Sequence, residues 1–169
     1  MTTRNPANVY LAIGGSDELT MPAQPAFLAK RNANTGGVTG DGTIYQIICD
    51  DEIFDQNNDY NNTTGVFTAP VTGKYTLTLN VGLYVINNIA FDDEYIEIVT
   101  SNRTYRVSQF NPFVLTAALF LYEGSTITCD MDAADTAYGQ VMVSNGAKAI
   151  QVVGNAASPY TFFDGFLNV

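Results

Sequence analysis

The sequence predicts an all-β domain, a sandwich of two sheets that is most simply a jelly roll. Three observations predict it: apolar and polar residues alternate along short runs, turn-forming residues separate these runs, and no helical period persists beyond a couple of turns. At 169 residues the chain is long enough for one domain with a substantial core and too short for two comfortable ones. Hydrophobic residues make up 46% of it, as in ordinary folded globules.

The regular strand pattern begins at Ala26, after a leader of mixed character over residues 1–24. Within this leader, residues 9–13 form a short strand-like apolar patch. Gly, Asn, Asp and Pro residues fill the turns, for example at 32–37 and 55–59. The expected strands cover residues 26–31, 43–49, 65–69, 73–86, 94–100, 103–109, 113–121, 125–131, 138–143, 147–153 and 160–168.

Alternation is clearest over residues 74–81. Its apolar members point to one face and its polar, Thr-rich members to the other, which predicts a strand with one buried and one solvated face. The segment 113–121 is apolar on nearly both faces. One layer of core buries only one face of such a strand, so its other face is expected to meet a second sheet or another subunit.

Composition excludes several classes of function. The chain contains no His, the commonest general base and transition-metal ligand. Seven basic and seventeen acidic residues give a net charge of −10, which disfavours nucleic-acid binding. No apolar run approaches the ~20 residues of a membrane span, and no signal peptide precedes the leader, so we expect synthesis in a host cytoplasm and no membrane contact.

Two cysteines, Cys49 and Cys129, each lie in an apolar alternating stretch. Buried free thiols are the favoured interpretation, and a disulfide between them is the alternative. No CxxC motif or cluster of His and Cys accompanies them, so we expect neither a zinc site nor any other cofactor.

Acidic clusters at 50–52, 92–94 and 130–135 raise the possibility of calcium binding, but they lack the spacing of a calcium loop. Solvated turn carboxylates are the favoured interpretation. Glycosidase chemistry also uses paired carboxylates, yet no one pair stands out and the chain contains no Trp, so we expect no enzyme activity. The loop 55–62 is interpreted as a plain surface loop, with sugar binding through its Asn, Asp and Tyr side chains as the alternative.

Residues 60–75, with the sequence YNNTTGVFTAPVTGKY, resemble a signature of the C1q/tumour-necrosis-factor-like family. The shared pattern is Tyr, a turn, Thr-Gly-x-Phe, a small residue with Pro, and Gly-x-Tyr opening a long strand. Segments 25–29, 53–55, 115–127 and 158–167 are similar to further family segments in the same order. The chain departs from the pattern at Ser125, where the family usually has Asp, and in an insertion around Phe163 and Asp164.

The resemblance covers about residues 25–169 and implies a ten-stranded jelly-roll sandwich that packs as a tight threefold homotrimer. Residues 1–24 then form a short extended N-terminal arm. By the same resemblance, aromatic side chains line the trimer axis. The interface aromatics are expected to include Tyr84, Phe120, Tyr122 and Phe166.

A trimer with an anchoring arm and no stalk predicts a structural virion protein, a decoration (cement) trimer of a bacteriophage capsid. The arm would bind the major capsid protein or another virion component at the virion surface, as an added strand or across the shell. Its expected anchor residues are Arg4, Val9, Tyr10, Leu11 and Ile13. The alternative is the receptor- or glycan-binding head of a phage fibre, with a host-surface glycan as partner. The missing signal peptide and disulfide framework disfavour a secreted regulatory ligand.

Overall fold

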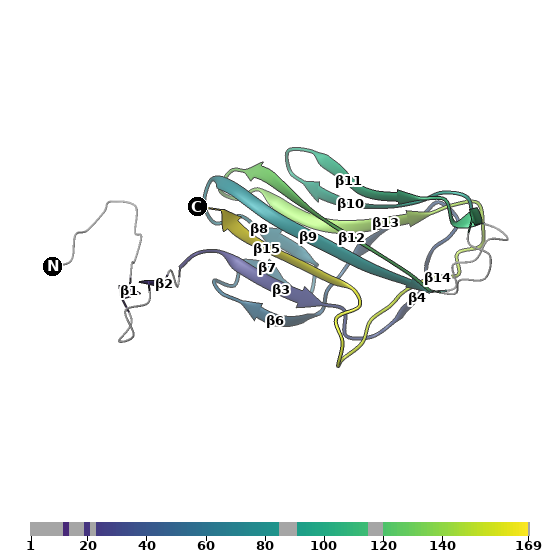
Figure 1. Cartoon of the computed structure of the whole chain (residues 1–169), viewed down its shortest axis with the longest axis horizontal. Coiled ribbons are helices and arrows are strands. Elements are labelled where there is room, and N and C mark those ends of the chain that lie inside the picture. Colours follow the sequence, from purple (N-terminus) through teal and green to yellow (C-terminus); the bar gives the residue numbers. More distant parts are fainter. Residues whose placement is uncertain (1–11, 14–18, 21–22, 85–90, 115–119, 169) are drawn as a thin grey trace.

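Two β-sheets of six and seven strands pack face to face in the computed structural model (Figure 1). The structure describes residues 12–13, 19–20, 23–84, 91–114 and 120–168. Across these ranges the one helical element is a 3-10 turn at Pro112–Val114 (η1). No helix in this part of the chain is long and apolar enough to cross a membrane. The predicted all-β sandwich is therefore confirmed.

The first sheet has the strand order β11-β10-β13-β8-β7, and β5 also pairs with β13. Its neighbours are antiparallel, as in a sandwich built from hairpins and longer connections. The bounds are β5 Ile44–Ile47, β7 Tyr60–Asn61, β8 Val66–Thr68, β10 Glu94–Thr100, β11 Thr104–Phe110 and β13 Thr136–Val143.

The second sheet has the order β4-β14-β9-β15-β3-β6, and β12 pairs with the other side of β9. Strands β9 and β12 pair over twelve residues each, from Tyr84 opposite Phe120 to Gly73 opposite Met131. The bounds are β3 Ala26–Lys30, β4 Thr35–Thr39, β6 Asp51–Asp55, β9 Gly73–Tyr84, β12 Phe120–Met131, β14 Ile150–Val152 and β15 Phe162–Asn168.

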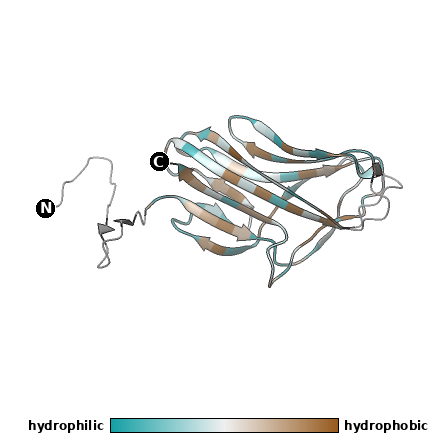
Figure 2. Ribbon diagram, viewed as in Figure 1, coloured by the Kyte–Doolittle hydropathy of each residue, from teal (hydrophilic) through white to brown (hydrophobic). Residues whose placement is uncertain are grey.

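Alternating side chains of the two sheets form the core. Figure 2 shows the matching alternation of hydrophobic and hydrophilic residues along the strands. On β9 the predicted apolar set is buried at 0–1% exposure: Tyr75, Leu77, Leu79 and Val81. At one end of the core, Phe27 stacks on the rings of Tyr60 and Phe67, with centroid distances of 4.9 and 4.8 Å. Phe163 meets Phe27 edge to face at 5.3 Å. Because β15 pairs with both β3 and β9 without a register shift, the insertion around Phe163 is absorbed within a regular strand.

The predicted strand 113–121 is wrong at its start, because Pro112–Val114 form the 3-10 turn η1. Residues 115–119 lie outside the described residues. The last two residues of the predicted strand, 120 and 121, begin β12. This strand continues without a break through 125–131, which was predicted as a separate strand. Pro112 explains the difference at the start, since proline fixes φ near −65° and has no N–H to donate to a ladder.

Four short strands, β2 (Leu19–Thr20), β4, β6 and β7, were not among the predicted strands. Strand β4 contains Gly36 and Gly37, and β6 contains three acidic residues, both of which have low intrinsic strand propensity. Strand β4 forms because it pairs with β14, and β6 forms because it pairs with β3, in spite of these low propensities. Both cysteines are free and buried, which confirms the thiol interpretation.

Candidate interaction surface

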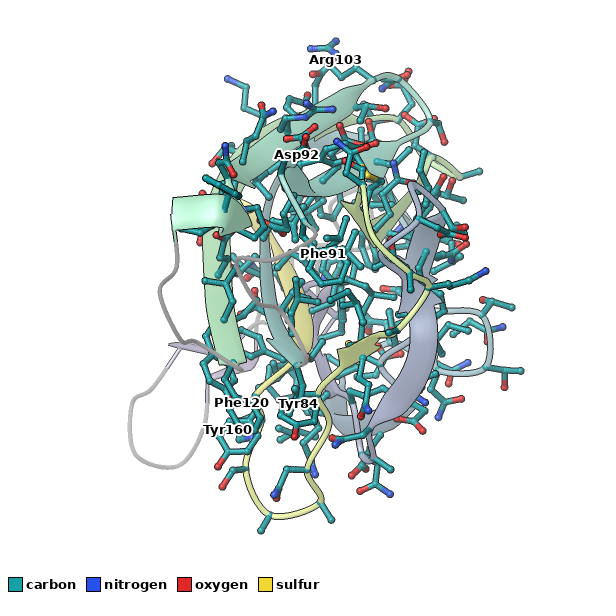
Figure 3. All side chains as sticks on the ribbon, turned by 90° about the vertical axis from the view of Figure 1, so that its right-hand side faces the viewer. Tyr84, Phe91, Asp92, Arg103, Phe120 and Tyr160 are labelled. Carbon is teal, nitrogen blue, oxygen red and sulfur yellow. The ribbon has the colours of Figure 1, made fainter. Side chains whose placement is uncertain are left out.

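Three half-exposed aromatic side chains gather on the face of the second sheet that points away from the core; Figure 3 labels Phe120 and Tyr160 beside Tyr84. Phe120, Tyr122 and Tyr160 are 50%, 47% and 41% exposed. Phe120 lies 4.5 Å from the ring of Tyr84 and 6.3 Å from the ring of Tyr122, and Tyr122 lies 5.6 Å from Tyr160. Exposed aromatic side chains in mutual contact are typical of interaction sites. We call Tyr84, Phe120, Tyr122 and Tyr160 the aromatic cluster.

The register of β9 and β12 builds this cluster. Phe120 stands opposite Tyr84, and Tyr122 stands opposite Gly82. A Cβ at Gly82 would lie 2.8 Å from the Tyr122 ring, so the absence of a side chain there lets this ring lie across the backbone of β9. On the other side of β9, Asn80 donates its amide to the carbonyl of Tyr160 at 2.6 Å and holds the loop before β15 against the sheet.

Phe166 lies on the same face but apart from the cluster. It stands opposite Thr76 on β9, six residues along that strand from Gly82, or about 20 Å at the usual rise per residue. Phe166 is 45% exposed, and Phe54 on the edge strand β6 is 49% exposed. The structure therefore brings together three of the four expected interface residues. Tyr160 was not predicted, because it reaches the cluster through the register of three strands.

A polar strip separates the aromatic cluster from Phe166. On it Thr76 pairs with Thr128 at 3.3 Å, and Thr78 pairs with Thr126 at 3.0 Å, each through their hydroxyl groups. Asp164 stands opposite Thr78, and its Oδ1 is buried without a hydrogen-bond partner. Burial raises the pKa of this carboxyl above its usual value, and hydrogen bonds from Thr78 oppose the rise.

Four of the five expected anchor residues lie outside the described residues, namely Arg4, Val9, Tyr10 and Leu11. Ile13 belongs to β1 (Ala12–Ile13), where it pairs with Leu19 of β2 (Leu19–Thr20) in a separate two-stranded sheet. Within the described residues the leader thus forms local strand pairs. Its binding to another molecule stays a prediction.

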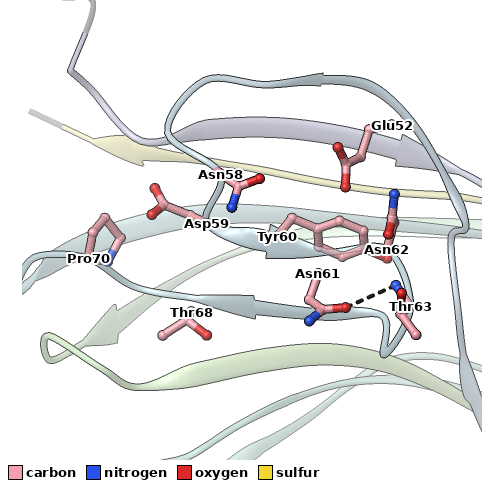
Figure 4. A pocket seen from close by; sticks show the side chains of 9 residues that line it. All are labelled: Glu52, Asn58, Asp59, Tyr60, Asn61, Asn62, Thr63, Thr68 and Pro70. Carbon is pink, nitrogen blue, oxygen red and sulfur yellow. Dashed lines mark hydrogen bonds between the residues drawn. The ribbon is translucent and has the colours of Figure 1, made fainter.

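A polar hollow of about 630 Å³ opens beside the loop 55–62 (Figure 4). Asn58 adopts a left-handed backbone conformation with φ of 61°, and the Oδ2 atom of Asp59 is buried without a partner. Burial raises the pKa of Asp59, and the charge of Asp55 adds to the rise. The ring of Tyr60 is only 3% exposed, so the hollow has no aromatic platform from this residue. The lining side chains are Glu52, Asn58, Asp59, Tyr60, Asn61, Asn62, Thr63, Thr68 and Pro70.

The acidic clusters differ from one another. In 130–135, Asp130 forms an ion pair with Arg103 at 3.2 Å, and Asp135 accepts hydrogen bonds from Asn102 and from the backbone N–H of Asp132. In 50–52, Asp51 forms an ion pair with Lys30 at 2.9 Å. Across the described ranges no group of three or more potential ligands could hold a metal ion.

The prediction of solvated turn carboxylates is wrong for Glu94 in the cluster 92–94. Glu94 is the first residue of β10, and its side chain is completely buried. Its place in the strand pattern, where it alternates with the buried Ile96 and Ile98, turns it towards the core in spite of its charge. Residue type predicts an exposed Glu at this position, whereas the alternation of β10 predicts a buried one.

A family model described as the C1q domain matches residues 26–167. The globular domain of zebrafish complement 1qA has a similar structure, with a TM-score of 0.59, 17% identity, and coverage of 86% of this chain and 98% of that one. Murine APRIL superposes with a TM-score of 0.55 at 10% identity, covering 86% and 99%. Eiger TNF from S. frugiperda gives 0.55 at 10% identity, covering 86% and 93%. No curated protein matches the sequence.

Proposed function

This chain belongs to the C1q domain family, and from that premise we propose that it is a non-enzymatic structural module whose copies assemble as a homotrimer through the exposed face of the second sheet. Trimeric binding or structural domains are typical of C1q/TNF-like folds. The observation that carries the proposal is the aromatic cluster, in which Phe120 and Tyr122 stay about half exposed in the single chain. Covering them with another copy removes apolar area from water, which is the main driving force of association.

The trimer is tested by sedimentation velocity of the full chain over a dilution series. We expect a species of three times the chain mass of 18.3 kDa at micromolar concentration. A single species of one chain mass across that range would exclude the proposal.

Within this function, our first candidate role is decoration of a bacteriophage capsid at the virion surface, with the leader as the anchor. Two observations support it. The family match begins at residue 26, so the leader lies outside the matched residues, and Ala12 and Ile13 in it pair with Leu19 and Thr20 as strands. A segment that forms strand pairs can add to the sheet edge of a neighbouring protein. The anchor residues of this proposal are Arg4, Val9, Tyr10, Leu11 and Ile13.

Co-sedimentation of the full chain with virus particles tests the anchor. The variant Tyr10→Ser/Leu11→Ser is expected to stay in the supernatant while it keeps the sedimentation coefficient of the wild type. Ile44→Ser, on the first sheet, is the matched control and should sediment with the particles. Binding of both variants equal to the wild type would overturn the anchor role.

The polar hollow beside the loop 55–62 favours a second candidate, the receptor- or glycan-binding head of a fibre. Amide and carboxylate groups such as those of Asn58, Asn62 and Asp59 suit sugar hydroxyls. Retention on a glycan array that is lost in Asn58→Ala/Asn62→Ala would support this role over decoration. Absence of retention, together with co-sedimentation, would support decoration.

A further inference from the structure

In the described part of the chain, the buried carboxyl group of Glu94 has neither a counter-charge nor a hydrogen-bond donor beside it. Glu94 is 0% exposed, and neither of its side-chain oxygens accepts a hydrogen bond from a donor group in the described residues. A buried charge without a counter-charge or donors costs several kcal/mol, so such a group is normally paired or neutral.

The groups around Glu94 offer no positive charge. Its strand β10 lies between β11 and β13, where it stands opposite Phe110 and the buried Val143. The charges that act on it are the carboxylates of Glu123 on β12 and of Asp93, its chain neighbour. Segments 85–90 and 115–119, outside the described residues, contain no ionisable side chain in their sequence.

Glu123 approaches Glu94 from the opposite sheet. It stands opposite the buried Val81 of β9, on the inward side of β12. Its Oε2 accepts a hydrogen bond from the hydroxyl of Ser108 on β11 at 2.6 Å. Glu123 is half-buried, whereas Glu94 is fully buried. A fully buried carboxyl group beside a second carboxylate ionises only at high cost, but as a carboxylic acid it can donate a hydrogen bond to that carboxylate.

We propose that Glu94 stays protonated in the folded chain and donates a hydrogen bond to Glu123, and that this contact forms a latch between the two sheets, which closes at neutral pH and opens in alkali. The proton makes Glu94 a donor to the Glu123 carboxylate, which Ser108 holds in place. Burial, and then the charge of Glu123 and its hydrogen bond, raise the pKa of Glu94 to about 9, which agrees with this arrangement. Deprotonation would leave two negative charges facing each other between the sheets.

The latch holds β12 from its inward side. The adjacent residue Tyr122 points to the opposite face and belongs to the aromatic cluster. The latch does not depend on the trimer, since all its groups belong to one chain.

A divalent cation between the two carboxylates is the other way to neutralise them. Calcium prefers six to eight oxygen ligands, and the Glu94, Glu123 and Ser108 side chains provide five, one of which donates to another. A proton therefore fits the described groups better than a metal ion.

The sign of the pH dependence follows from linkage. In the unfolded chain Glu94 ionises near its ordinary pKa of about 4.3, whereas the folded chain keeps the proton up to about pH 9. The protonated Glu94 therefore stabilises the folded chain fully below its pKa in the unfolded chain. This stabilisation is lost as pH rises towards its pKa in the folded chain. In that window the unfolding equilibrium constant should rise by about tenfold per pH unit from this group alone.

The experiment measures the protons released when the full chain unfolds in denaturant at pH 7, for the wild type, Glu94→Gln and Glu52→Gln. Gln is close in shape to the protonated acid and can still donate to Glu123. We expect the wild type and the Glu52→Gln control to release about one proton more than Glu94→Gln. The pH dependence of the unfolding midpoint between pH 5 and 8 should likewise flatten only in Glu94→Gln.

Equal proton release by all three proteins would overturn the latch, because Glu94 would then be ionised in the folded chain. A rise of the wild-type midpoint with CaCl₂ or MnCl₂, reversed by EDTA and absent in Glu94→Gln, would overturn it in favour of a metal ion. If Glu94→Gln does not fold, Ser108→Ala provides the second test. Without the hydroxyl that holds Glu123, the chain should unfold in alkali at a lower midpoint pH than the wild type does. An unchanged midpoint in that variant would also count against it.

Discussion

Replacement of Phe120 by Ser should break the assembly and leave the single chain folded. Phe120 is 50% exposed in the described chain. A large aromatic side chain buries about 200 Å², so roughly 100 Å² of this ring is left for a neighbouring copy to cover. At about 25 cal/mol per Å² that area stabilises a complete interface by about 2.5 kcal/mol per copy, or roughly 7 kcal/mol for three copies.

About 7 kcal/mol corresponds to roughly a 10⁵-fold fall in the association constant of the trimer. Within the single chain the substitution removes the contact with Tyr84 at 4.5 Å, which is worth about 1 kcal/mol. Sedimentation velocity should therefore show Phe120→Ser as single chains at concentrations where the wild type is a trimer. Its thermal midpoint, measured below the association range, should change by only a few degrees.

Ile44→Ser is the matched control for this experiment. Ile44 is 53% exposed and lies on β5 in the first sheet, so the substitution removes a similar exposed apolar side chain from a different face. We expect this variant to remain trimeric. The reasoning is refuted if Phe120→Ser assembles like the wild type, or if Ile44→Ser dissociates as readily.

Three further predictions concern the single chain. Phe27→Ala should lower the free energy of unfolding by about 3–5 kcal/mol, because Phe27 is 1% exposed and contacts three other rings; a loss below 1 kcal/mol in chemical denaturation would contradict the stacked core. The thiols should resist a disulfide reagent at pH 8 until the chain unfolds, because burial raises the pKa of Cys49 to about 12 and that of Cys129 to about 11; rapid labelling of the native chain would show that they are accessible. Asp164→Asn should make the chain more stable at pH 7 relative to pH 3 than the wild type is. The raised pKa of Asp164 in the folded chain means that its contribution is complete below the unfolded value of about 3.9 and is lost as pH rises through the folded value, so an unchanged difference in unfolding midpoint would contradict its burial.

The parts of the fold that could be predicted are those where apolar residues at a period of two mark an inward face along a whole strand. The alternation of β9 and the bounds of β10 follow from residue types at a period of two. Strands β4 and β6 could not be predicted in this way, because their Gly and acidic residues form strands only through pairing with β14 and β3. These partner strands are distant in the sequence, so the residues of β4 and β6 alone do not indicate them.

The candidate site shows the same division. The resemblance to the C1q/tumour-necrosis-factor-like family, applied to the aromatic residues of the chain, predicted Phe120 and Tyr122 as interface residues. Their distance from Phe166 depends on the register of β9 with β12 and β15, which no local pattern specifies. The burial of Glu94 was missed for a different reason, since a carboxylate is almost never fully buried unless it is paired.

The exposed face of the second sheet is half polar, yet it is prepared for burial. A neighbouring copy that covers this face would remove its hydroxyl groups from water, which is costly when they lose their partners. Here Thr76 and Thr128 already bond to each other, as do Thr78 and Thr126, within one chain. Covering them therefore strips no hydrogen bond that the assembly must replace, and the aromatic cluster can supply most of the association free energy. Thr126→Val, which leaves Thr78 its hydrogen bond to Asp164, should accordingly leave the trimer intact in sedimentation velocity. Thr78→Val, which takes a hydrogen-bond partner from both Thr126 and Asp164, should weaken it.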